Sequence, residues 1–153
     1  MRHEQKGFSL VELLVVVIII AIVAAIAIPN LLASRRAANE ASAISSLRTY
    51  HSAEATYQAT TGNSVSYATA PNLTGLVDAV LAVAAPAKSG YTFTVTIGGT
   101  NNSTYCATAA PTTAGTTGTN YFGVGVDGVI YKGTVALGCA DGVLALNGAL
   151  PIQ

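Results

Sequence analysis

The sequence is poor in charge and contains no tryptophan. Charged residues make up 9% of its 153 positions, whereas hydrophobic residues make up 51%. An average soluble domain carries roughly 25% charged residues. This scarcity predicts that part of the chain lies out of water, in a membrane or against copies of itself. The length suits one ordinary domain with an appendage and leaves no room for a second large core.

The few charges cancel, with seven Lys and Arg against seven Asp and Glu. Nucleic-acid binding is not supported, because it would require a basic surface. The only histidines, His3 and His51, lie far in sequence from the two cysteines, so no cluster of metal ligands is evident. No Ser/His/Asp or Cys/His constellation is plausible either. We therefore expect a protein that is not an enzyme and has no cofactor.

The longest feature is an apolar run, Phe8–Ile28, whose single charge is Glu12. As a helix with about 1.5 Å of rise per residue, this run can cross the roughly 30 Å hydrocarbon layer of a membrane. A lone span must satisfy its backbone internally, which predicts a helix rather than a strand. A secretory signal peptide would end at a small-residue cleavage site, and only Ala24, Ala25 and Ala27 offer a weak one.

Glu12 is the most informative residue of this run. A carboxylate inside an apolar helix costs a few kcal/mol unless it has a partner or lies near the interface. One interpretation is an interfacial side chain that reaches the lipid headgroups. In the other, cleavage after Gly7 frees an amine at Phe8, and that amine meets Glu12 of a neighbouring chain and fixes the register of a bundle.

The segment Lys6–Asn30, KGFSLVELLVVVIIIAIVAAIAIPN, closely resembles the type IV prepilin signature. In that signature a short basic leader ends in Gly, Phe usually follows, and a Glu comes four residues later. The resemblance implies that a prepilin peptidase cuts between Gly7 and Phe8 and methylates the new amine of Phe8. It also implies that Glu12 guides docking into a growing filament. Since positive charges flank the span equally, the resemblance alone places the N-terminus in the cytoplasm.

Pro29 follows the apolar run, removes a backbone donor and clashes with the preceding turn. We expect a kink there, and the resemblance implies a loss of helical order over Ala25–Leu31 on packing; a plain helix end is the alternative. Beyond it, apolar residues at steps of three and four predict that the helix continues to about Thr60, with Gly62 as its C-cap. Alanines along this helix favour close self-packing, although a simple anchor with an alanine-rich stalk is an alternative.

The C-terminal half has strand patterns. Tyr91–Ile97 alternates apolar residues with threonines, and its apolar face is predicted to pack on the helix, with Thr104–Ala109 as the paired strand. The connector, 62–90, is predicted to contain a short helix at about Leu76–Ala84. Residues 91–153 are predicted to form an antiparallel β-domain.

Asp127-Gly128 between two apolar runs is a strong hairpin signal. A two-residue loop there predicts that Val126 pairs with Val129 and Val124 with Tyr131. Aspartates in Asp-Gly turns are usually turn formers. Some related secretion pseudopilins carry calcium in such loops, and this stays an alternative to the expected absence of a metal.

Cys106 and Cys139 are the only cysteines. The extracellular location that the resemblance implies favours a disulfide between them, which would close a loop of just over thirty residues and stabilise the fold by about 4 kcal/mol. Two buried free thiols are the alternative. Disulfide-bounded C-terminal regions are common in type IV pilins, although the spacing here is only generically similar.

Together these patterns predict an α+β fold, in which a long N-terminal helix packs on a small antiparallel β-sheet with a disulfide-bounded C-terminal region. The expected parts are a leader, 1–7, the helix, 8–61, with its span at 8–28, the connector, 62–90, and the β-domain, 91–153. The resemblance implies the subunit of an extracellular type IV pilus, a homopolymer served by a prepilin peptidase and an assembly machinery in the inner membrane. A type II secretion pseudopilin and a monomeric membrane-tethered adhesin are the alternatives.

Overall fold

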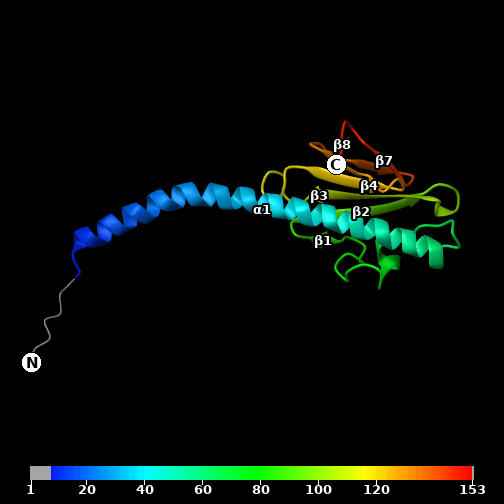
Figure 1. Cartoon of the computed structure of the whole chain (residues 1–153), viewed down its shortest axis with the longest axis horizontal. Helices are drawn as coiled ribbons and strands as arrows, with labels where there is room; N and C mark the ends of the chain where they lie inside the picture. The colour runs from blue at the N-terminus through cyan, green and yellow to red at the C-terminus, as the bar shows by residue number, and fades with distance from the viewer. Residues whose placement is uncertain (1–7, 153) are drawn as a thin grey trace, which may run out of the picture. The chain divides into compact units, whose positions relative to one another are not determined.

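The computed structural model describes residues 8–152, which form one long helix followed by an antiparallel sheet (Figure 1). The elements are α1 (Leu10–Thr60), η1 (Ala70–Leu73), β1 (Ala87–Lys88), β2 (Tyr91–Gly98), η2 (Thr100–Asn102), β3 (Thr104–Pro111), β4 (Tyr121–Gly125), β5 (Ile130–Gly133), β6 (Gly138–Ala140), β7 (Val143–Ala145) and β8 (Leu150–Pro151). The predicted fold class is confirmed. A boundary between Ser34 and Arg35 separates two compact units, which are described separately.

In the second unit, one face of α1 forms the core with the sheet. Its buried residues recur at steps of three and four, as an amphipathic helix requires, and they include Leu47 and Tyr50. The Tyr50 ring lies 6.0 Å from that of Phe93, and the Tyr50 hydroxyl donates to the carbonyl of Leu81 at 2.7 Å. The predicted packing of the apolar face of β2 on the helix is confirmed.

Six strands form the main sheet in the order β1-β2-β3-β4-β5-β8, and all neighbours are antiparallel. The longest ladder runs from Tyr91 opposite Pro111 to Gly98 opposite Thr104. Burial along the first half of β2 alternates between buried aromatic residues and exposed threonines, as a strand with one face on a core requires.

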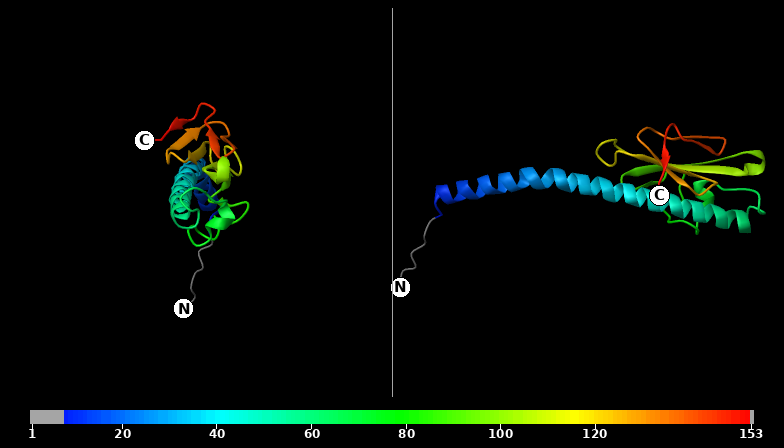
Figure 2. Two further views of the ribbon diagram at one scale, coloured as in Figure 1. Left: turned by 90° about the vertical axis from the view of Figure 1, so that its right-hand side faces the viewer. Right: turned by 45° about the horizontal axis from the view of Figure 1, so that its top comes forward.

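The β6–β7 hairpin lies on the other face of the sheet, seen above it in the right-hand view of Figure 2. Phe122 and Val124 belong to the core with α1, so Gly123 between them points the other way. A Cβ at Gly123 would lie 2.7 Å from a methyl carbon of Leu144. The glycine therefore provides the space into which the hairpin packs.

The predicted disulfide is confirmed. Cys106 on β3 is bonded to Cys139 on β6, with their Cα atoms 6.0 Å apart and a sequence separation of 33. Because β6 and β7 form a separate two-stranded sheet, the disulfide is a covalent cross-link between this small hairpin and the main sheet, in addition to the backbone.

The predicted register of the Asp-Gly hairpin is wrong by one residue. Val124 pairs with Ile130 and not with Tyr131. Val126 lies in the loop instead of pairing with Val129. The glycine of the Asp-Gly pair has φ +70°, and its amide donates to the carbonyl three residues earlier at 3.1 Å. These are features of a three-residue loop, which has one residue more than the type I′ turn the sequence favoured.

The helix predicted at Leu76–Ala84 is also wrong, because those residues form turns and bends. The helical turn of the connector is η1, a 3-10 helix, and β1 lies inside the connector as well. Leu73 and Leu81 are buried in the core, and the carbonyl of Leu81 accepts the Tyr50 hydroxyl. Tertiary packing therefore fixes these turns and overrides local helix propensity.

Glu40 of α1 holds the threonine-rich loop between β3 and β4. Its carboxylate accepts the amide and hydroxyl of Thr119 at 2.9 and 3.0 Å and the side-chain amide of Asn120 at 2.8 Å. Partial burial acts to raise the pKa of Glu40, but the hydrogen bonds outweigh it and leave that pKa below its ordinary value. The adjacent Asn39 donates to the carbonyl of Thr117 at 2.9 Å.

Glu54 is fully buried on the core face of α1. One oxygen of its carboxyl accepts the amide of Ala68 at 2.9 Å, and the other has no hydrogen-bond partner among the described residues. Burial raises the pKa of Glu54 to about 7, although the bond from Ala68 acts against the shift. The carboxyl is thus held in its neutral form well above the pH at which an exposed Glu ionises.

We predict that Glu54→Gln removes a pH dependence of stability. Between pH 4.5 and about 7 the folded chain retains a proton that the unfolded chain has lost, so the free energy of unfolding falls as pH rises through this window. The expected fall is roughly 3 kcal/mol. It is measured by chemical denaturation of the full chain in detergent from pH 5 to 8, where Glu54→Gln should give a flatter profile.

Glu40→Gln is the matched control. The pKa of Glu40 is lower in the folded chain than in the unfolded chain, so Glu40 stabilises the fold at every pH above its unfolded-state pKa. That contribution is lost only as the pH falls below this range. The profile of Glu40→Gln above pH 5 should therefore follow that of the unsubstituted chain. Identical slopes for Glu54→Gln and the unsubstituted chain would contradict the assignment.

We predict that reduction of the disulfide lowers the free energy of unfolding by about 2 to 4 kcal/mol, the typical worth of a bridge that closes a loop of this size. Thermal unfolding with and without reductant measures the effect. The double variant Cys106→Ala, Cys139→Ala controls for other effects of the reductant and should not respond to it. An unchanged melting temperature in chains whose thiols are shown to be free would overturn the prediction.

Candidate assembly helix

Phe8 and the first part of α1 expose large apolar side chains on all sides. Each of the following exposes 47% or more of its surface: Phe8, Leu10, Val11, Leu13, Leu14, Val15, Val16, Val17, Ile18, Ile19, Ile20, Ile22, Val23, Ile26 and Ile28. A helix that is apolar on all sides is stable in lipid or packed among other helices, but not in water. Some other apolar surface must therefore cover this one.

Length and hydropathy make this part of α1 a candidate membrane span. Its most apolar window has a mean hydropathy of 3.3, and none of that window is buried within the chain. A signal sequence near an N-terminus has the same length and composition. The apolar helix itself agrees with the prediction made from Phe8–Ile28.

Glu12 lies in the first turn of α1 and binds back to the residue before the helix. Its carboxylate accepts the backbone amide of Ser9 at 2.9 Å, and the carbonyl of Ser9 accepts the amide of Leu13 at 3.3 Å. Ser9 is thus the N-cap and Glu12 the third helical residue, as in a capping box. The Ser-x-x-Glu spacing was readable in the sequence, although the apolar context drew attention to the charge of Glu12 rather than to its position.

Phe8 directly precedes this cap and exposes 79% of its surface. Gly7, on the other side of the predicted cleavage site, lies outside the described residues. Phe8 and Glu12 lie at the same end of α1, with Ser9 between them in sequence. An amine created at Phe8 would therefore be at the helix end that carries the carboxylate.

α1 continues without a break through Pro29. Proline has no amide to donate to the carbonyl of Ala25 in the preceding turn. The side chain of Asn30 donates to the next carbonyl, that of Ile26, at 3.1 Å. Loss of helical order over Ala25–Leu31 is thus not a feature of the single chain and stays a prediction for the assembled state.

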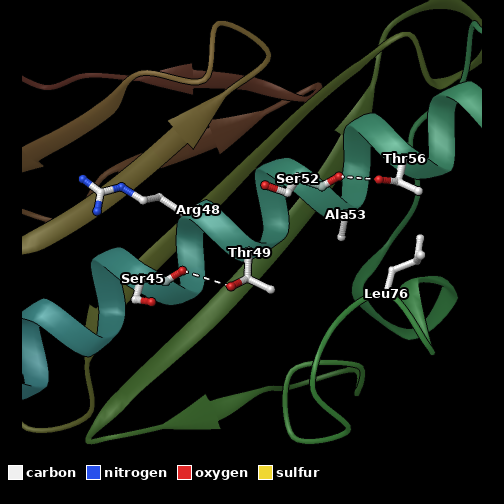
Figure 3. A pocket seen from close by; sticks show the side chains of 7 residues that line it. All are labelled: Ser45, Arg48, Thr49, Ser52, Ala53, Thr56 and Leu76. Atoms are coloured by element: carbon white, nitrogen blue, oxygen red, sulfur yellow. Dashed lines mark hydrogen bonds between the residues drawn. The ribbon is translucent and has the colours of Figure 1, made fainter.

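In the second unit, the face of α1 away from the sheet carries short polar side chains. A groove of about 340 Å³ runs along it, lined by Ser45, Arg48, Thr49, Ser52, Ala53 and Thr56 of α1 and by Leu76 of the connector (Figure 3). The hydroxyls of Thr49 and Thr56 donate to helix carbonyls one turn earlier, at 3.1 and 2.9 Å. Because these hydroxyls are satisfied by the helix itself, another surface can pack here without breaking their bonds.

The two turn aspartates accept hydrogen bonds within the fold. Asp127 accepts the amide of Val129 at 3.2 Å and the hydroxyl of Tyr131 at 3.0 Å, and Asp141 accepts the amide of Gly99 at 2.9 Å. Within residues 8–152 no group of three His, Cys, Asp or Glu side chains is placed to hold a metal ion. The contacts of Asp127 are those of a turn former, whereas Asp141 joins its turn to the end of β2, 42 residues away in sequence.

Comparison with known proteins gives a family match at the N-terminus and a similar curated protein. The family described as "Prokaryotic N-terminal methylation motif" matches residues 2–28. The type IV wide pilus major component PilA4 of Thermus thermophilus is 60% identical over 38 residues, which are 25% of this chain and 29% of that protein. The matched stretch thus spans less than a third of the curated relative. No solved structure matches the chain.

The matched residues include the cap, the carboxylate and most of the exposed apolar helix described above. The N-terminal segment of the chain thus carries a prokaryotic N-terminal methylation motif, and the chain is similar over 38 residues to a type IV pilin.

Proposed function

We propose that the chain is the precursor of a structural subunit of an extracellular type IV pilus. A leader, residues 1–7, is removed after Gly7, the new amine of Phe8 is methylated, and the apolar helix moves from the membrane into the core of a filament. The observation that carries the proposal is the exposed apolar surface of α1, which no described residue covers. The proposed role of the chain is structural, and we propose no catalytic activity for it.

In a filament, neighbouring helices would have to replace the lipid around the apolar helix. Moving an apolar helix into water is prohibitive, whereas moving it from lipid into a bundle of identical helices exchanges one apolar environment for another. Such an exchange has little hydrophobic driving force, so specific contacts must decide it. Glu12 supplies one, through the amine of Phe8 on a neighbouring copy, because opposite charges attract strongly in a medium of low dielectric constant.

The sheet edges support assembly through the helix. The edge strands β1 and β8 have two residues each, Pro86 precedes the first, and Pro151 lies within the second. Short edges that contain proline are poor templates for pairing with another chain. Growth by strand addition is therefore disfavoured, and the helix is the surface left for self-assembly.

This proposal implies three kinds of partner. The copies of the chain bind one another, a prepilin peptidase acts on the bond between Gly7 and Phe8, and an assembly machinery in the inner membrane extracts the helix. The N-terminus lies in the cytoplasm before processing. We further propose that helix packing in the filament melts α1 around Pro29, where proline already lacks one backbone hydrogen bond.

We predict that filaments sheared from cells contain a chain that begins at Phe8. It should carry one methyl group on its amine and be about 0.85 kDa lighter than the precursor, by the mass of the seven leader residues. Mass spectrometry of the filament subunit, with electron microscopy of the same sample, measures both. Full-length chain in the filaments would refute the processing, and short assemblies confined to the periplasm would indicate a type II secretion pseudopilin.

We predict that Glu12→Ala leaves the chain in the membrane but abolishes filaments, because the carboxylate that meets the amine of Phe8 is lost while the apolar span is retained. Membrane fractionation and counts of filaments per cell are the measurements. Glu4→Ala is the control, since it removes a carboxylate from the leader and should leave filament numbers unchanged. Normal filaments from Glu12→Ala would rule out a role of Glu12 in assembly. Absence of self-association in the unsubstituted chain would favour a different function, that of a tethered adhesin.

A further inference from the structure

We propose that the carboxylate of Glu12 has two alternative partners, the backbone amide of Ser9 in its own chain before assembly and the amine of another copy after it. The inference rests on the proposed function for its second partner only. The first partner is a described contact, with the Ser9 amide 2.9 Å from the carboxylate.

The first contact explains how the single chain tolerates a carboxylate in an apolar segment. A carboxylate at the third helical position accepts an otherwise unpaired amide and faces the positive end of the helix dipole. Hydrogen bonds to an ionised acceptor are roughly twice as strong as those between neutral groups. The cap therefore stabilises Glu12 at the helix start without any second chain, so the unassembled precursor can remain in the membrane.

The second contact is available only after cleavage. In the precursor the nitrogen of Phe8 is part of a peptide bond and carries no charge, so it offers Glu12 no ammonium group. Cleavage creates an ammonium group at Phe8, and a full positive charge attracts the carboxylate more strongly than a neutral amide does. Processing thus changes which partner Glu12 prefers, and the cap delays pairing until a cleaved chain arrives.

The side chain of Gln separates the two roles. Gln is accepted at the third position of a capping box, because its carbonyl oxygen can receive the N-cap amide, but it has no charge to attract an amine. Leu provides neither contact and retains an apolar side chain. Glu12→Gln should therefore preserve the helix start and lose assembly, whereas Glu12→Leu should lose both.

The test is amide hydrogen exchange at Ser9 in full-length chain in detergent micelles, measured by NMR. Glu12→Gln should keep the protection of the unsubstituted chain to within a factor of about two, and Glu12→Leu should exchange roughly 2- to 30-fold faster, the range that the worth of a helix cap implies. Ser9→Ala is the matched control, because it retains the backbone amide that donates. Equal exchange in all four chains would overturn the first contact.

The second contact is tested in assembled filaments by solid-state NMR. The carboxyl carbon of Glu12 should lie close to the methylated nitrogen of Phe8 and no longer close to the amide nitrogen of Ser9. Mixed filaments, in which half the copies carry ¹³C and the other half ¹⁵N, distinguish the amine of another copy from the chain's own. If Glu12 in the filaments stays bonded to Ser9, or pairs only within its own chain, the exchange of partners is overturned and the proposed pilus function still stands. If the unsubstituted chain forms no filaments, the proposed pilus function is overturned.

Discussion

An uncovered apolar helix is the constraint on which the rest of this structure depends. The first part of α1 is exposed and strongly apolar on every side, so the chain must lie in lipid or against other copies of this surface. That requirement assigns different tasks to the two units. The first unit provides an apolar helix that lipid or other helices can surround. The second unit must be stable by its own contacts while the surroundings of that helix change.

The second unit meets this demand by using both faces of a thin sheet. One face packs on α1 through aromatic residues such as Tyr50 and Phe93, and the other receives the β6–β7 hairpin over Gly123. The disulfide ties that hairpin to the sheet, and Glu40 ties the loop after β3 to the helix. These contacts lie within residues 35–152, so none of them has to break when the surroundings of the apolar helix change.

Local patterns in the sequence were sufficient for the main elements. The apolar run, the three- and four-residue steps after it and the alternation in Tyr91–Ile97 each reflect one element packed on one surface, so they predicted α1 and β2. The disulfide followed from the location that the prepilin signature implied. These predictions depended on no contact between distant segments other than the two cysteines.

Features set by long-range contacts were missed, because local patterns in the sequence do not show which distant segments meet. The connector turns depend on the bond from Tyr50 to Leu81, and Glu54 accepts a bond from Ala68, fourteen residues away. The hairpin register was missed for a different, local reason, because the loop has one residue more than the favoured turn. The cap at Ser9 is also local, and its spacing was present in the sequence. A charged residue can satisfy its own helix and still be needed by another chain, so an unusual carboxylate in an apolar segment has to be assessed first for what it binds within the chain.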